Sequence, residues 1–542
     1  MLLATKLPGM KKNTMALSIL LSFSSLSLAQ TRQEWVVKKS SWSSQDEKNY
    51  QDFISSIGEA AAAKKCISVE TCLKSSANPY HNSDPSNADF HSDCADLPYY
   101  LRTYFSWKNN LPFTYASEVV ALGESSDLRY SPMGNAVKKR SAVWSGQKGL
   151  TILNSIIPNV ISSADFRMEY DAGQGYEAPD FYSSHISREA IVPGTMIYDP
   201  AGHVAVVYKV SDDGRIHYID AHPDNSITSG IYSPKFARSN PRHGAGFKNW
   251  RPFKIVNARY NFSGEIVGGQ IVMARNSDIP EYGTEQYYGN QPNMDNWKKG
   301  QFVIGGRTMN YYDYVRFKMS KGNLVINPVE DFKEILEDIC VAVQDRGVAV
   351  QNALDAKISS APHPARLPRN IYGTEGEWET YSSPSRDARL KTSFVDLMNQ
   401  TRGYFEKLAA HDPTVRYEGS DLKADLRQAY QSIALACTVS YKRTDHSEVT
   451  LNLDQVRKRL FDLSFDPYHC AELRWGASGD ELSTCQDDSV KRRWYTQEQW
   501  LRNQIDRTYE AKMDYSLGEL NGPKPGAGVL NPPDVDILNL LQ

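Results

Sequence analysis

The sequence SDCADL at residues 92–97 decides how the first half of the chain is expected to fold, together with GHVAVVY at residues 202–208. The first stretch places a thiol, Cys94, where a helix begins. The second places an imidazole, His203, at the start of an apolar strand, and the strand after it ends in a carboxylate, Asp220. A thiol, a base and an orienting acid form the arrangement used for nucleophilic catalysis by cysteine.

A helix is predicted to begin within a few residues of Cys94. Apolar residues recur at helical spacing from residue 97 to residue 107, and Pro98 is tolerated only in a first helical turn. The sulfur would then lie near the positive end of the helix dipole, which favours thiolate and predicts a lowered thiol pKa. The alternative is a buried structural cysteine on a core helix.

Three short strands are predicted between residues 195 and 221, separated by turns rich in Asp, Gly and Pro. If the last two pair as an antiparallel hairpin, the strand ends that carry His203 and Asp220 come together. Asp220 would then hold the His203 ring and set its tautomer. Alternation places His222 on the same face as Asp220, so it leaves open which of the two is the third catalytic group.

The N-terminus has the pattern of an export signal. A basic pair at residues 11–12 precedes an apolar and Ser-rich run at residues 15–28, and a small-x-small site ends at Ala29. The alternative, a membrane anchor, is disfavoured because the run is shorter than the roughly 20 residues that a span needs. A signal peptide predicts a periplasmic or secreted protein, and no later stretch is predicted to span a membrane.

The chain has seven cysteines, an odd number. An odd cysteine in an exported protein indicates a reactive thiol or an intermolecular bridge. Connectivity is not fixed by sequence, but local spacing and predicted helix faces leave Cys94 as the unpaired residue. The pairings they favour are Cys66–Cys72, Cys340–Cys437 and Cys470–Cys485.

Composition excludes some classes of function. The 542-residue chain has a formal net charge of −3 and no basic block, so nucleic acid is not an expected partner. The Cys and His positions lack zinc-site spacing, and the prediction is no metal and no cofactor. The oligomeric state is left open.

More than one domain is expected at this length. Residues 110–190 form an insertion that could line a substrate cleft, and residues 247–255 and 264–273 could extend the sheet. The C-terminal helices carry no catalytic signal and are expected to act as a scaffold or in substrate recognition. The expected order is a signal peptide (1–29), an α+β domain with an antiparallel sheet (30–278), a connector (279–322), a mainly α-helical domain (323–520) and a Gly/Pro-rich tail (521–542).

Several motifs in this order resemble those of a known family. They are Pro79-Tyr80, Phe90, Asp93-Cys94, PGTMIY at 193–198, HVAVVY at 203–208 and YIDA at 218–221. Together they resemble NlpC/P60-type papain-like cysteine peptidases. The resemblance implies a cysteine-bearing helix packed on an antiparallel sheet that carries the histidine and a third polar residue. It also implies cleavage of peptide or amide bonds, most often in the stem peptides of bacterial cell wall.

The resemblance implies a role for each matching residue. Cys94 would be the nucleophile, His203 the general base and acid, and Asp220 the orienting group. Tyr80 falls near a tyrosine that in this family helps at the oxyanion, and Asp93 and His222 would be auxiliary. The chain departs from the pattern in three places: no Gly pair follows the tyrosine, Ala-Asp-Leu replaces Ser-Gly-Phe after the cysteine, and the interval from cysteine to histidine is longer.

The leading hypothesis is therefore an exported cysteine peptidase or amidase that forms a thioester intermediate and acts on a peptide or peptidoglycan substrate. The Cys, His and Asp-Ala-His-Pro order is also similar to transglutaminase-like domains, which would transfer the acyl group to an amine. A third hypothesis is a non-catalytic exported binding protein on a papain-like scaffold.

Overall fold

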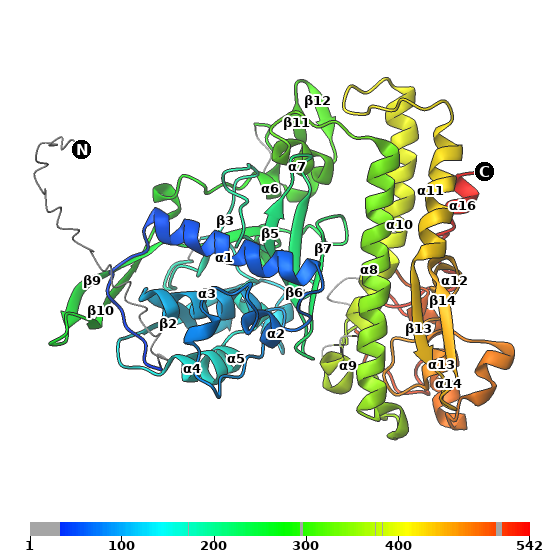
Figure 1. Ribbon diagram of the computed structural model, residues 1–542, viewed down its shortest axis with the longest axis horizontal. Helices are drawn as coiled ribbons and strands as arrows, with labels where there is room; N and C mark the ends of the chain where they lie inside the picture. The colour runs from blue at the N-terminus through cyan, green and yellow to red at the C-terminus, as the bar shows by residue number, and fades with distance from the viewer. Residues whose placement is uncertain (1–32, 172, 293–295, 374, 382, 506–511) are drawn as a thin grey trace, which may run out of the picture.

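The structure, a computed structural model, combines helices with antiparallel sheets, the coarse class that the sequence predicts (Figure 1). It describes residues 33–171, 173–292, 296–373, 375–381, 383–505 and 512–542. The predicted signal peptide, residues 1–29, lies outside the described residues. Among the helices that are described, none is long and apolar enough to cross a membrane.

A six-stranded antiparallel sheet forms the centre of the first half, in the order β3-β8-β4-β5-β6-β7. The three predicted strands are β4, β5 and β6, and the last two pair as the predicted hairpin. Residues 204–207 of β5 form an unbroken apolar run because both faces of the sheet are covered there. The strands are β3 (Phe181–Ser183), β4 (Met196–Asp199), β5 (His203–Val210), β6 (Ile216–Ala221), β7 (Ile227–Ile231) and β8 (Gly246–Trp250).

One face of the sheet packs against α1 (Ser44–Ala62) and α3 (Asp96–Asn109), beside the short α2 (Val69–Leu73). Val204 and Val206 of β5 belong to this core. α3 is buried on all sides from Asp96 to Trp107, which explains why its aromatic residues are not confined to one face. Figure 1 shows α1 and α3 lying across the sheet.

The opposite face packs against α7 (Tyr311–Met319) and the short β11 (Phe302–Ile304). Ala205 and Val207 belong to this second core. These elements fall in the stretch expected to be a connector, so that stretch contributes an ordered layer over the sheet. The remaining elements here are α6 (Glu285–Tyr288) and β12 (Arg307–Met309).

Two long hairpins of the first half lie outside the central sheet, besides the short β11–β12 pair. β1 (Phe113–Ala121) and β2 (Asn135–Val143) form one, and β9 (Phe253–Tyr260) and β10 (Ile266–Met273) form the other. The expectation that residues 247–255 and 264–273 extend the sheet holds only for β8. Pro252, which has no N–H to donate, separates β8 from β9 and ends the strand.

The second half of the chain is mainly helical. α8 (Pro328–Asp355), α10 (Ser383–Ala409) and α11 (Leu422–Ala436) stand side by side and share one apolar core (Figure 1). The predicted Gly/Pro-rich tail also joins it, because α16 (Ile537–Leu540) buries Ile537 there. The other elements are α4 (Gly149–Thr151), α5 (Ile157–Val160), α9 (Gly376–Thr380), β13 (Thr438–Lys442), β14 (Glu448–Asn452), α12 (Leu453–Lys458), α13 (Ala471–Arg474), α14 (Ser489–Gln497) and α15 (Gln499–Arg502).

All three predicted disulfides are present. They leave Cys94 as the cysteine that takes part in no disulfide in the described structure. The bridges fit a disulfide-bonded secreted protein. They join Cys66 to Cys72, Cys340 to Cys437 and Cys470 to Cys485.

A buried carboxylate joins the two halves of the molecule. Asp331 of α8 is 3% exposed and pairs with Arg215 at the β5–β6 turn and with Arg316 of α7, whose Nη1 lies 2.6 Å from it. The Tyr404 hydroxyl of α10 donates to its other oxygen. The junction between sheet and helices is therefore polar and fully paired at Asp331.

Replacing Asp331 by alanine is expected to destabilise the protein by about 3–5 kcal/mol, because it leaves two arginines without their buried partner. The matched control is Glu330→Ala, one residue earlier on α8, where the side chain is 61% exposed. That variant should change the free energy of unfolding by less than about 0.5 kcal/mol. Urea unfolding measures both, and equal effects would contradict a buried junction.

Candidate active site

Asp93 begins the first turn of the helix that carries the thiol. Its carboxylate accepts hydrogen bonds from the backbone N–H groups of Ala95 (2.9 Å) and Asp96 (3.0 Å), and its carbonyl accepts from Leu97 at 3.1 Å. This is N-cap geometry, and it makes Cys94 the first residue of the turn. Within the described structure the Cys94 backbone N–H donates no hydrogen bond, so it can donate one to an oxygen of a ligand.

The Cys94 sulfur lies against the start of β5. It is 3.9 Å from the carbonyl oxygen of Gly202, and the backbone N–H of Val204 also interacts with it. Gly202 has φ of +87°, and a Cβ there would lie 2.9 Å from the Tyr130 hydroxyl. The turn before β5 therefore requires glycine, for its conformation and for its space.

His203 and Asp220 form the predicted pair. His203 Nε2 lies 2.6 Å from Asp220 Oδ2, and both residues are buried. The Thr228 hydroxyl of β7 donates to the other oxygen of Asp220. Because a carboxylate only accepts, Nε2 carries the proton, and Nδ1 of the neutral ring keeps a lone pair that can take another.

His222 stands beside this pair. Its Nε2 lies 3.1 Å from the Thr228 hydroxyl and 3.8 Å from Asp220 Oδ2. The rings of His203 and His222 are stacked with centroids 5.9 Å apart. The hydrogen bond thus selects Asp220 as the partner of His203, a choice that strand alternation leaves open. Thr228 was not found from sequence, because nothing local marks a threonine on a neighbouring strand.

A cavity of about 140 Å³ at the start of β5 is lined by Cys94, His203 and His222. Cys94 reaches it from the face covered by α3, whereas the His203 ring lies toward Phe236 of the other face, with centroids 6.5 Å apart. The predicted insertion supplies one part of the wall and the helical half supplies another. These contributions are Arg129, Tyr130, Ser162 and Ser163 from the insertion, and Ser385, Ala388, Arg389 and Thr392 from α10.

The protonation of the site differs from the sequence prediction. Burial raises the pKa of the Cys94 thiol well above its usual range, and the Asp93 carboxylate adds to the shift. The prediction of a thiol pKa lowered by the helix dipole is therefore wrong, because burial outweighs the dipole. Burial lowers the pKa of His203, and Arg389 lowers it further. The pair rests as a neutral thiol and a neutral imidazole.

Asp220 remains ionised beside them. Burial acts to raise the pKa of Asp220, but its electrostatic interactions with His222 and His203 and the hydrogen bond from His203 outweigh it. The pKa is held well below its usual range, so Asp220 can stabilise an imidazolium when His203 accepts a proton.

The raised pKa predicts how Cys94 reacts with iodoacetamide. Only the thiolate is alkylated, so the alkylation rate of a free cysteine, whose pKa is about 8.5, levels off above that pH. The Cys94 rate should be lower than that of a free cysteine at pH 7 and should still rise about tenfold per pH unit at pH 9. Intact mass spectrometry follows the alkylation. An alkylation rate that reaches its plateau below pH 8 would show a preformed thiolate–imidazolium ion pair instead.

Tyr80, predicted as an oxyanion donor, lies elsewhere. Of the described residues that line the cavity, Tyr80 is not one. Its hydroxyl donates to Asn109 at 3.2 Å, and its ring packs against Phe53 and Phe105. The aromatic core between α1 and α3 holds this ring, so the predicted role of Tyr80 is withdrawn.

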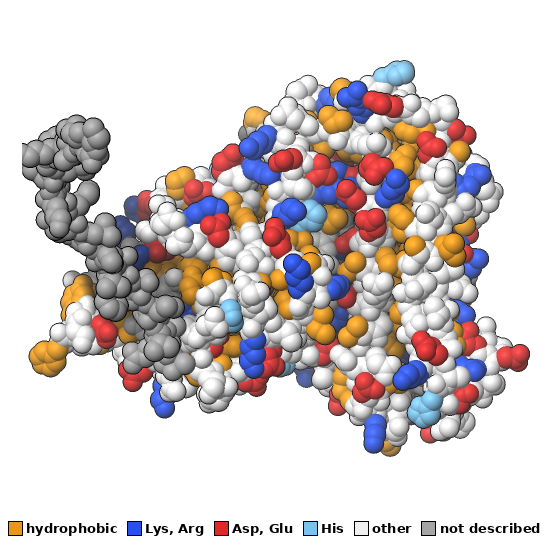
Figure 2. Space-filling model, viewed as in Figure 1, with side chains coloured by type: hydrophobic (Ala, Val, Ile, Leu, Met, Phe, Trp, Pro, Cys, Tyr) orange, Lys and Arg blue, Asp and Glu red, His pale blue; other side chains and the backbone are white. Residues whose placement is uncertain are grey.

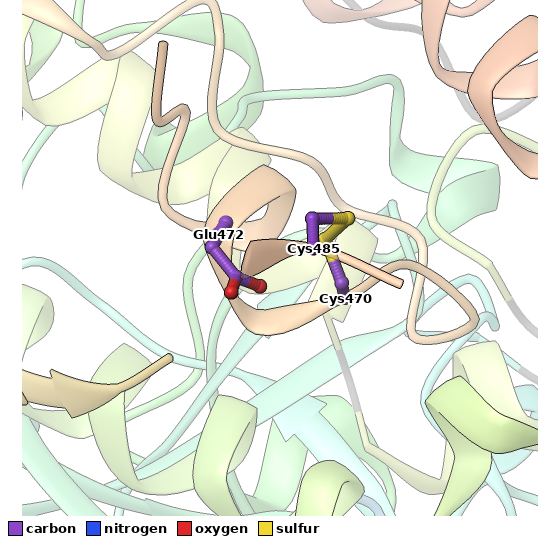
Figure 3. A group of neighbouring side chains, drawn as sticks. All are labelled: Cys470, Glu472 and Cys485. Carbon is purple, nitrogen blue, oxygen red and sulfur yellow. A yellow bond between two sulfur atoms is a disulfide. The ribbon is translucent and has the colours of Figure 1, made fainter. Parts of the chain in front are cut away.

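Two clusters elsewhere have the residue types of metal ligands. Figure 3 shows that the first, around Glu472, contains the Cys470–Cys485 disulfide, whose sulfurs are bonded to each other. In the second, His363 Nε2 lies 2.6 Å from Asp466, and Glu498 lies 3.9 Å from the Arg502 guanidinium. Both carboxylate oxygens of Glu498 are buried and have no hydrogen-bond partner among the described residues, and burial raises the pKa of this carboxyl well above its usual range.

The chain was compared with protein-family models, curated proteins and solved structures, and nothing in any of the three matches it.

Proposed function

We propose that the protein is a cysteine hydrolase that cleaves peptide or amide bonds through a Cys94-His203-Asp220 triad, in an NlpC/P60-type papain-like arrangement. The observation that carries the proposal is the buried His203–Asp220 hydrogen bond, with His203 and the unbridged Cys94 lining one cavity. A base held by an acid, next to a nucleophile, is the requirement for this chemistry.

The first half of the reaction forms a thioester. The Cys94 sulfur attacks the substrate carbonyl carbon, and its proton passes to Nδ1 of His203. The tetrahedral intermediate collapses, the carbon–nitrogen bond breaks, and the leaving amine takes the proton from His203. Because thiol and imidazole both rest neutral, proton transfer accompanies attack and does not precede it.

Water resolves the thioester in the second half. His203 takes a proton from the water as its oxygen attacks, and the Cys94 sulfur leaves and recovers the proton. In both halves of the reaction the oxyanion can accept a hydrogen bond from the backbone N–H of Cys94, at the start of the helix. One such donor is worth about 2.7–4 kcal/mol of transition-state stabilisation.

The substrate we propose is a peptide outside the cytoplasm, of which the stem peptide of peptidoglycan is the leading candidate. The export pattern at residues 1–29 and the three disulfides support this location. The test is digestion of soluble wall fragments by the protein from residue 30 onward, followed by mass spectrometry. New amine and carboxyl ends that depend on Cys94 support a hydrolase.

The same experiment separates the alternatives. With an added primary amine, a product joined to that amine would indicate acyl transfer in place of hydrolysis. Binding of fragments without cleavage, unchanged in Cys94→Ala, would overturn the proposal in favour of a binding protein.

A further inference from the structure

Arg389 is the basic residue of the cavity that is left for a ligand. It lies on α10 and lines the cavity that holds Cys94 and His203. In the described parts of the chain its guanidinium takes part in no hydrogen bond or ion pair, whereas Arg129, which also lines the cavity, pairs with Asp127 and Glu379. Lys235, the other basic residue there, pairs with Asp338 at 2.8 Å.

The charge of Arg389 reaches the catalytic groups. It lowers the pKa of Cys94, His203 and His222, with burial as the larger influence on each. A positive charge near His203 opposes the imidazolium that forms during catalysis, so an unpaired Arg389 hinders proton uptake. An anion bound to Arg389 would cancel the part of this effect that Arg389 causes.

A carboxylate fits this position better than a phosphate. The arginine fork matches a carboxylate with two parallel hydrogen bonds. The cavity is small, about 140 Å³, and it is also lined by the acidic Asp93 and Asp199, besides Glu379, which pairs with Arg129. A doubly charged group would meet one free guanidinium and two acids, whereas a single carboxylate is balanced by Arg389 alone.

We propose that Arg389 binds a free carboxylate of the substrate, within about one residue of the amide that Cys94 attacks, so that the enzyme selects peptides with a carboxylate at the cleaved end. This rests on the proposed function for the role of Cys94. It assigns substrate selection to the helical half of the chain, which supplies no triad residue. The bond to be cleaved is then set by the distance between α10 and the start of β5.

The test uses two probes of Cys94 that differ only in charge. Iodoacetate carries a carboxylate and iodoacetamide does not, and both alkylate the same sulfur. The ratio of their rates at pH 8.5 cancels any change in thiol pKa. We expect Arg389→Gln to lower the iodoacetate-to-iodoacetamide ratio about tenfold, the effect of losing one charge-assisted contact. Arg402→Gln, an exposed position on the same helix, should leave the ratio unchanged.

A second comparison uses matched peptides that end in a carboxylate or in an amide. The wild type should cleave the carboxylate form preferentially, and Arg389→Gln should lose that preference mainly through KM. An unchanged alkylation ratio in Arg389→Gln overturns the inference and leaves the hydrolase intact. If neither peptide is cleaved but the iodoacetate-to-iodoacetamide ratio still falls in Arg389→Gln, the proposed function is overturned and the anion site stands.

Discussion

Replacing Cys94 by alanine is expected to lower turnover of a susceptible amide by about 10⁴-fold or more, since the variant has no atom that can form the thioester. His203 and Asp220 keep their hydrogen bond in this variant because neither depends on the sulfur. The residual rate would come from binding and the backbone donor alone. Release of new amine groups from wall fragments measures the loss.

The unfolding temperature of Cys94→Ala shows whether its loss of activity comes from misfolding. The thiol is half-buried at the cavity and touches backbone atoms, so Cys94→Ala should unfold at nearly the wild-type temperature. Labelling without reductant should place one iodoacetamide on the wild type and none on the variant, because the other six cysteines are bridged. Activity retained by a correctly folded Cys94→Ala contradicts the triad.

Asp220→Asn should reduce kcat by about 10⁴-fold, the typical cost of losing the orienting acid of such a triad. An asparagine amide can donate to His203 Nε2, which moves the ring proton to Nδ1, the nitrogen that must accept the thiol proton. The charge that stabilises the imidazolium is lost as well. Kinetics on wall fragments at saturating substrate measure kcat.

His222→Gln is the matched control for Asp220→Asn. His222 lies 3.8 Å from Asp220 and hydrogen-bonds Thr228, so it supports the acid and does not hold the His203 ring. The expected loss in kcat is at least tenfold smaller than for Asp220→Asn. If His222→Gln were the more damaging variant, the third catalytic group would have to be reassigned.

The parts of the site that lie close in sequence could be predicted. The alternation in residues 203–210 and the turn that follows are local signals, and they led to the His203–Asp220 pair and to the β5–β6 hairpin. Thr228 and Arg389 could not be found this way. Each reaches the site through packing of an element distant in sequence, and no spacing rule links them to Cys94.

Burial and long-range packing also explain the predictions that failed. The helix start at Cys94 is a local feature and was expected to lower the thiol pKa, but the protein around the sulfur reverses the shift. The residues expected to be a connector gain their order from the apolar face of the sheet that they cover. The β13–β14 hairpin was not predicted, although β13 alternates exposed and buried residues, because the strands are short and lie within a mainly helical stretch.

The central claim is that His203 assists the attack of Cys94, and acylation by p-nitrophenyl acetate tests it without a known natural substrate. Intact mass reports the gain of one acetyl group, and peptide mapping assigns it to Cys94. The account predicts acylation of the wild type at pH 7, at least about 10²-fold slower acylation of His203→Ala, and partial recovery in imidazole buffer. Equal rates in the wild type and His203→Ala would contradict it.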